Sequence, residues 1–174
     1  ELYWGMRDTR TLEAYGANIL GVREALPRML QAFDAYGVKA TFATVGLLFF
    51  DDKEAMLRGL PTEHPGYANR SLSPYESHFD RVGPNEVEDR YHFGASLVRM
   101  IKDHPGHEIG CHTFSHYYCL ERGQTEAQFA ADLRAAKSAA TALGVELTSF
   151  VFPRNQYNER YLGICRTEGI TSYR

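Results

Sequence analysis

The chain has 174 residues, the length of one ordinary domain, and 44% of them are hydrophobic, which excludes a disordered chain. Its net charge of −3 provides no general basic field, which argues against a nucleic-acid binder. No run of eighteen apolar residues is present to cross a membrane. Aromatic residues make up 13% of the chain, which suits either a sugar-binding site or an aromatic core.

The cysteines indicate a reducing environment. Cys111, Cys119 and Cys165 are odd in number and irregularly spaced, so they do not form a disulfide framework. They contain no CxxC pair, which excludes a thiolate zinc knuckle. Reduced thiols are typical of cytosolic proteins, and we therefore expect a cytoplasmic location.

The first half of the chain predicts a strand end, a helix, a strand and a second helix. Residues 1–20 are expected to hold the end of a strand and then a charged loop. Apolar residues at helical spacing predict a helix over 22–36, with Pro27 near its first turn and Gly37 as its C-cap. A β-branched run over 38–45 predicts a buried strand, and a second helix is expected over 47–60.

The second half predicts more of the same alternation after a long loop. The segment 61–90 is rich in proline, glycine, serine and charge, and we expect it to form a wall of the functional cleft. Beyond it, helices are expected over 92–103, 125–143 and 158–168, and strands over 107–111, 147–152 and 170–173. No hairpin signal separates the strands, so the sequence predicts an α/β fold of parallel strands. Chemistry is then expected after residues 4, 45, 111 and 152, where strands end.

Two histidines stand in one of these loops. His112 and His116 directly follow the strand over 107–111, and imidazoles four residues apart can reach one point. Zinc binds neutral imidazole nitrogens. Seven histidines give this spacing by chance with appreciable frequency, so a packed or surface pair is the alternative.

The residues around this pair resemble a known family. HEIGCHTFSH, over 107–116, resembles the second motif of the polysaccharide deacetylases (the NodB-homology domain, carbohydrate esterase family 4-like). GVKATFATVG, over 37–46, is similar to a strand of that family, and FPRN, over 152–155, stands where its arginine motif lies, with Pro-Arg-Asn in place of Arg-Pro-Pro. The resemblance runs from about residue 18 to the end, and it implies a partial or distorted (β/α) barrel.

The resemblance also implies a metal site and its chemistry. His112 and His116 would bind a divalent metal, zinc or alternatively cobalt, nickel or manganese, and Glu1 matches the acidic ligand of a spaced Asp-x-Glu motif. Arg154 would orient a carboxylate base or stabilise charge, with a structural arginine as the alternative. The base would lie before Glu1, and two later motifs, including the one that supplies the general acid, would follow Arg174. Residues 1–174 are therefore expected to be a single domain that is incomplete at both ends.

Four further residues are candidates for substrate contact. Trp4 could stack on a sugar ring, and Tyr117 and Tyr157 could line the pocket, with core packing as the alternative for each. Thr113 places a hydroxyl between the two histidines. The remaining polar candidates are expected to be structural or solvated: His92, the acidic pair at 51–52, the Arg7–Asp8 pair, His64, His78, His104 and His107.

The expected activity is metal-dependent hydrolysis of an N-acetyl group from an amino sugar, with release of acetate. Two alternatives remain at this point. One is another C–N amide hydrolase of the same fold, such as an allantoinase-like enzyme, and the other is a catalytically inactive glycan-binding relative. A carbohydrate is the expected partner, nucleic acid is not, and a homo-oligomer is left open.

Overall fold

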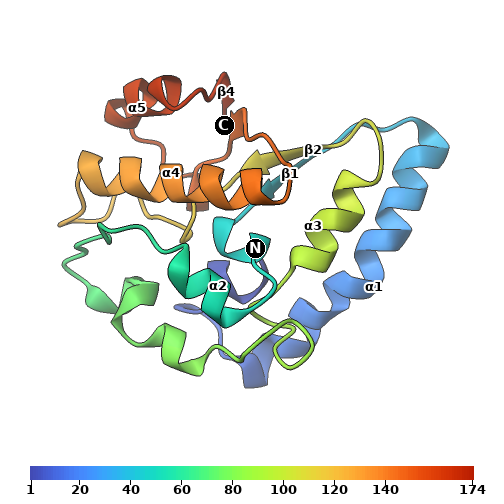
Figure 1. The fold of residues 1–174 in the computed structure, drawn as a ribbon, viewed down its shortest axis with the longest axis horizontal. Coiled ribbons are helices and arrows are strands. Elements are labelled where there is room, and N and C mark those ends of the chain that lie inside the picture. The colour runs from blue at the N-terminus through green and yellow to red at the C-terminus, as the bar shows by residue number, and fades with distance from the viewer.

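The four strands of the protein form one parallel sheet. The computed structural model describes residues 1–174, and the strand order is β1-β2-β3-β4 (Figure 1). The strands are β1 (Thr41–Thr44), β2 (Glu108–Cys111), β3 (Ser149–Phe150) and β4 (Ser172–Tyr173). Cys111 pairs with both Thr44 of β1 and Phe150 of β3, so the carboxyl ends of these strands meet at one edge. The predicted parallel α/β fold is confirmed.

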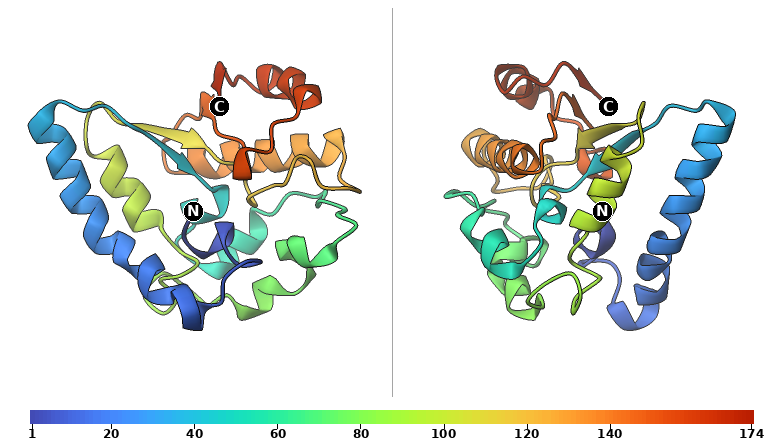
Figure 2. Two further views of the ribbon diagram at one scale, coloured as in Figure 1. Left: turned by 180° about the vertical axis from the view of Figure 1, so that it is seen from behind. Right: turned by 45° about the vertical axis from the view of Figure 1, so that its right-hand side comes forward.

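Helices cover the sheet on two sides. They are α1 (Leu12–Tyr36), α2 (Lys53–Arg58), α3 (Ala95–Lys102), α4 (Glu126–Ala142) and α5 (Leu162–Thr167). Figure 2 shows the strands between α4 on one side and the neighbouring helices α1 and α3 on the other. Thr125 and Gln128 form the predicted capping box at the start of α4. No helix is both long and apolar enough to cross a membrane.

Helix α1 is longer than the sequence predicts. It begins at Leu12, ten residues before the expected start, and the Thr11 hydroxyl caps it by accepting from the Ala14 N–H. Pro27 therefore lies inside the helix rather than near its first turn, which corrects that expectation. Gly16 and Gly21 interrupt the apolar pattern and concealed the first three turns. Gly37 ends the helix in the left-handed conformation, as predicted.

Two other expected elements differ from the structure. The segment after Glu1 is a short 3₁₀ turn, η1 (Leu2–Gly5), and not the end of a strand. The expected second helix is divided into the 3₁₀ turn η2 (Gly46–Phe49) and α2, because Asp52 is extended and caps α2 through the Ala55 N–H. Polar residues 51–52 thus interrupt the predicted helix rather than lying on its surface.

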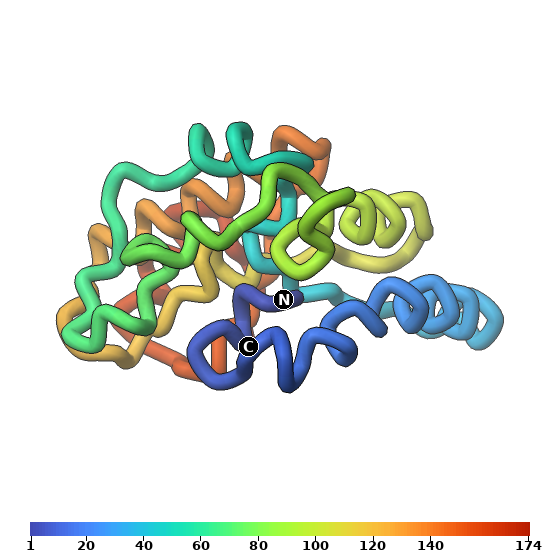
Figure 3. Tube along the Cα trace, turned by 90° about the horizontal axis from the view of Figure 1, so that it is seen from below, coloured from blue at the N-terminus to red at the C-terminus, as the bar shows by residue number.

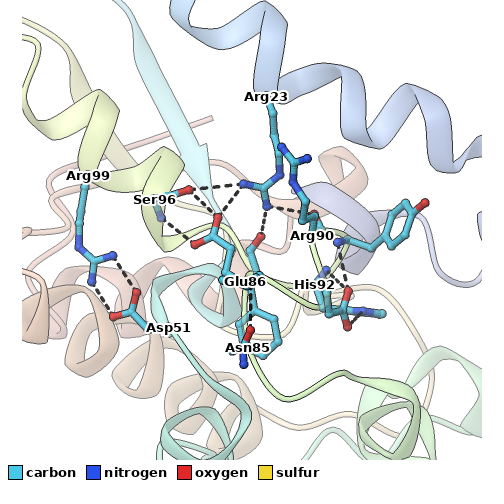
Figure 4. A network of polar contacts seen from close by, with 12 residues as sticks. Arg23, Asp51, Asn85, Glu86, Arg90, His92, Ser96 and Arg99 are labelled. Atoms are coloured by element: carbon cyan, nitrogen blue, oxygen red, sulfur yellow. Dashed lines mark hydrogen bonds and ion pairs between the residues drawn. The ribbon is translucent and has the colours of Figure 1, made fainter.

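The long segment 61–90 is packed rather than loose. It crosses the face of the molecule that is nearest the viewer in Figure 3, and it buries Tyr67, Phe79 and Val82. Glu86 attaches it to two helices, since its carboxylate accepts from Arg23 of α1 at 2.7 Å and from the Ser96 hydroxyl of α3 at 2.5 Å (Figure 4). The segment is therefore a fixed wall of the molecule.

A cavity opens beside the edge strand β1. Its volume is about 540 Å³, and it lies between α1, β1 and α3. Thirteen of its eighteen lining residues are hydrophobic, so its walls do not suit a polar sugar. Glu1 lines this cavity and also faces the histidine pair.

Candidate metal centre

Glu1, His112 and His116 converge at the carboxyl ends of the strands. Their potential ligand atoms all lie within 4.8 Å of one another. His112 Nε2 is 3.1 Å and His116 Nε2 is 3.9 Å from Glu1 Oε1. The two imidazole rings are 5.0 Å apart between centroids and are almost fully buried. The chain thus brings together residues 111 positions apart in the sequence.

The orientation of His112 leaves a lone pair facing the carboxylate. Its Nδ1 lies 2.8 Å from the Val151 carbonyl oxygen, which can only accept, so Nδ1 carries the proton that is donated there. In the neutral ring Nε2 is then an acceptor, and it is buried without a hydrogen-bond partner. Two acceptors, His112 Nε2 and Glu1 Oε1, therefore face each other at 3.1 Å. A divalent cation between them would satisfy both, so these residues fit a metal.

The protonation states at neutral pH also fit a metal. When the His112 ring also carries a proton on Nε2, this N–H can donate to Glu1, and the contact lowers the pKa of the Glu1 carboxyl to about 2. A metal ion would take the place of that proton. Burial, together with the charge that His112 can carry, lowers the pKa of His116 to about 3. Glu1 is then a carboxylate and His116 a neutral imidazole at pH 7, and these are the forms that bind zinc.

An ion pair lies next to this cluster. Arg154 Nη2 contacts both carboxylate oxygens of Asp8 at 2.7 Å, and its guanidinium carbon lies 4.4 Å from the centre of the Tyr118 ring. The Tyr118 ring in turn packs edge-on against His116 at 5.2 Å. Asp8 is 5% exposed and Arg154 is 33% exposed. Arg154 is therefore held beside the cluster with part of its guanidinium open to solvent.

Most of the chain matches a known family. The profile of the polysaccharide deacetylases matches residues 16–173. The chain belongs to the polysaccharide deacetylase family. No curated protein is significantly similar to it over its sequence.

Solved structures share the fold of this deacetylase-family chain. One is a CE4 family pseudoenzyme from Bacillus anthracis, with a TM-score of 0.51 at 16% identity over 86% of this chain. A mutant of that pseudoenzyme with restored enzymatic activity gives a TM-score of 0.52 at 16% identity over 87% of this chain. The match covers 38% and 39% of those proteins, so the chain spans about two fifths of their length. At this identity the likeness concerns the fold.

Among the predicted site residues of this deacetylase-family chain, two are aromatic core groups. Trp4 is fully buried and donates its indole N–H to the His92 carbonyl at 2.7 Å. Tyr117 is also fully buried, and its hydroxyl donates toward Gln124. The expected sugar contacts through Trp4 and Tyr117 are therefore corrected, since neither ring reaches solvent.

Thr113 and Tyr157 have different surroundings. The buried Thr113 hydroxyl donates to the His112 carbonyl at 2.6 Å and accepts from the Tyr117 N–H at 2.7 Å, so it shapes the loop instead of facing a substrate. Tyr157 is 45% exposed and lies three residues after Arg154, which leaves it free to contact a ligand.

Sequence reasoning missed several participants. Asp8 resembled half of a surface ion pair, but it lies 146 residues from the arginine that it holds.

The histidines outside the metal centre were expected to be solvated or structural. His92 is structural as predicted, because Asp89 accepts from its Nδ1 at 2.7 Å, whereas His78 is partly buried against it and His107 is 1% exposed. The burial of His78 and His107 depends on rings from distant parts of the chain, Trp4 and Phe33 among them, so no local pattern predicts it.

Proposed function

We propose that this chain carries the metal centre of a carbohydrate deacetylase that hydrolyses an N-acetyl group from an amino sugar or polysaccharide. The products would be acetate and a free amine. The observation that carries the proposal is the buried, unpartnered His112 Nε2, which faces the more exposed Glu1 Oε1 at 3.1 Å with His116 alongside. Membership of the polysaccharide deacetylase family supports the carbohydrate substrate.

The three side chains would hold a divalent cation through one carboxylate oxygen and two imidazole nitrogens. This donor set suits zinc, with cobalt, nickel and manganese as alternatives. When bound, such an ion would polarise the acetamide carbonyl and lower the pKa of a water molecule toward 7. The Val151 carbonyl fixes the tautomer of His112, so that its Nε2 lone pair stays directed at the ion.

Arg154 would position the substrate at the edge of the centre. The ion pair with Asp8 uses only Nη2, which leaves the donors at Nη1 and Nε for a substrate oxygen. Both oxygens of Asp8 are already engaged, so we assign Asp8 to holding the arginine rather than to proton transfer. Tyr157, exposed on the same loop, is the aromatic side chain that could contact the sugar.

Acetate release tests the proposal. We expect the zinc-loaded protein to release acetate from N-acetylated amino-sugar oligomers, to lose this activity with a chelator, and to regain it with zinc or cobalt. Arg154→Lys should raise KM, because lysine cannot keep the planar set of donors. Hydrolysis of cyclic amides without acetate release would favour an allantoinase-like enzyme. Sugar binding without hydrolysis would favour an inactive glycan-binding relative.

We further infer a cytoplasmic location. The support is chemical, since all three cysteines are free and buried. Finding the native protein in an oxidising compartment would contradict this inference.

A further inference from the structure

The loop that carries both histidine ligands is strained. Thr113 has φ = 63° and His116 has φ = 59°, in the left-handed region that non-glycine residues rarely adopt. For a β-branched residue such as threonine this conformation is a real outlier. Such a conformation persists only where the surroundings hold it. Something outside the loop must therefore keep His112 and His116 in their positions.

One side chain from α4 makes most of the polar contacts with the middle of this loop. Asp132 Oδ1 accepts from the Phe114 N–H at 2.6 Å, and Oδ2 accepts from the Ser115 N–H at 3.2 Å. Oδ2 also accepts from the Ser115 hydroxyl at 2.5 Å. The two residues that Asp132 holds are the central pair between Thr113 and His116.

Asp132 is an acidic side chain in an otherwise apolar environment. It is fully buried on the apolar face of α4, beside Phe129, Leu133 and Ala136, and it has no ion pair. A buried carboxylate without a cation is costly, and burial raises the pKa of Asp132 to about 6 despite its three donors. The donors it satisfies are those of the histidine loop, so its benefit lies at that loop.

We propose that Asp132 is a positioning residue, whose carboxylate holds the strained 113–116 loop and thereby sets the affinity of the metal centre. The claim about metal affinity rests on the proposed function, whereas the claim that Asp132 holds the loop does not. Partners that orient metal ligands typically change metal affinity by about 10- to 100-fold when they are removed. Asp132 acts one step further out than a ligand-bonded group, through the backbone of Phe114 and Ser115.

The test compares metal affinity in matched variants. Asp132→Asn keeps the shape but turns one acceptor oxygen into a donor, and Ser115→Ala removes one of the three hydrogen bonds. Glu126→Gln is the control, because it makes the same acid-to-amide change on the exposed side of α4. We expect the Kd for Zn²⁺ by competition titration to rise about 10- to 100-fold for Asp132→Asn, less for Ser115→Ala, and less than twofold for Glu126→Gln. The visible spectrum of the Co²⁺-loaded protein should change in Asp132→Asn only.

A second measurement needs no metal. Hydrogen exchange of the Phe114 and Ser115 amides in the metal-free protein should be at least about tenfold faster in Asp132→Asn than in Glu126→Gln. Unchanged exchange, or an unchanged Kd with faster exchange, would overturn the inference. If the unsubstituted chain binds no Zn²⁺, the proposed function fails and the claim about affinity fails with it. The exchange rates then still decide whether Asp132 holds the loop.

Discussion

At the scale of single residues, the ion pair between Asp8 and Arg154 makes a kinetic prediction. Asp8→Asn removes the charge that holds the guanidinium beside Tyr118, so the arginine should lose its fixed position. A lost charge-assisted contact of about 1 kcal/mol corresponds to roughly a fivefold higher KM for an N-acetylated oligomer, with kcat little changed. Steady-state kinetics measure both constants. Asp103→Asn, an exposed acid after α3, is the matched control, and a fall in kcat at constant KM would contradict the positioning role.

Gly46 makes a second prediction at this scale. Its N–H donates to the Thr113 carbonyl at 2.8 Å, and an added Cβ would lie 2.9 Å from the Phe114 Cα and 3.1 Å from the Ala136 Cα. Because two backbones leave no room, Gly46→Ala should destabilise the protein by about 1–3 kcal/mol and weaken metal binding.

Gly21 is the matched control for this substitution. A Cβ at Gly21 of α1 meets nothing within 4 Å, so Gly21→Ala should stabilise the protein by roughly 0.4–1 kcal/mol. Denaturant unfolding compares the two variants. Equal effects of the two substitutions would show that the close approach of η2 to the histidine loop is unimportant.

At the scale of elements, the wall formed by residues 61–90 predicts a sensitivity to acid. His78, on that wall, meets His92 at 2.9 Å between Nε2 atoms, and Asp89 holds the other nitrogen of His92. Burial, and then the charge that His92 can carry, lower the pKa of His78 to about 3. The folded state therefore disfavours protonation of the His78 imidazole, which in the unfolded chain takes up a proton near pH 6.5. Stability contributed by His78 is present above pH 6.5 and is lost as the pH falls toward 3.

His78→Gln tests this sign. The free energy of unfolding should fall less between pH 7 and pH 5 in this variant than in the original chain. The difference should be at most about 2 kcal/mol, since the His78 ring is partly solvated. His64→Gln, an exposed histidine on the same wall, should keep the original pH dependence. The measurement is thermal unfolding of the metal-free protein at the two pH values. A variant that lost stability with acid as steeply as the original chain would rule out the buried histidine as the cause.

Local patterns account for part of the fold and of the site. The capping box of Thr125 and the left-handed Gly37 were readable because helix ends depend on neighbouring residues. The spacing of His112 and His116 was readable because both follow one strand. The start of α1 was hidden by glycines, and the pairing of Asp8 with Arg154 depends on chain segments that meet only in the folded molecule.

At the scale of the whole molecule, a bound metal ion would link two distant parts of the chain and stabilise the folded state. It joins Glu1 to the loop after β2, where the hydrogen bond from the Tyr118 hydroxyl to Asp8 also links the amino-terminal segment to this loop. A ligand that binds only the folded state at 100 times its Kd adds about 2.7 kcal/mol to the free energy of unfolding. Zn²⁺ should therefore raise Tm in the original chain and much less in Glu1→Gln. An equal rise in both would show that Glu1 is not a ligand.

If Glu1, His112 and His116 bind one metal ion, elemental analysis of the purified protein will detect it. We expect about one zinc-like ion per chain, and its loss in the double variant His112→Ala/His116→Ala. The control His64→Ala/His104→Ala removes two other histidines and should keep the ion. Absence of metal from the original chain after incubation with zinc, or equal metal content in the two double variants, would show that these three residues do not form a metal site.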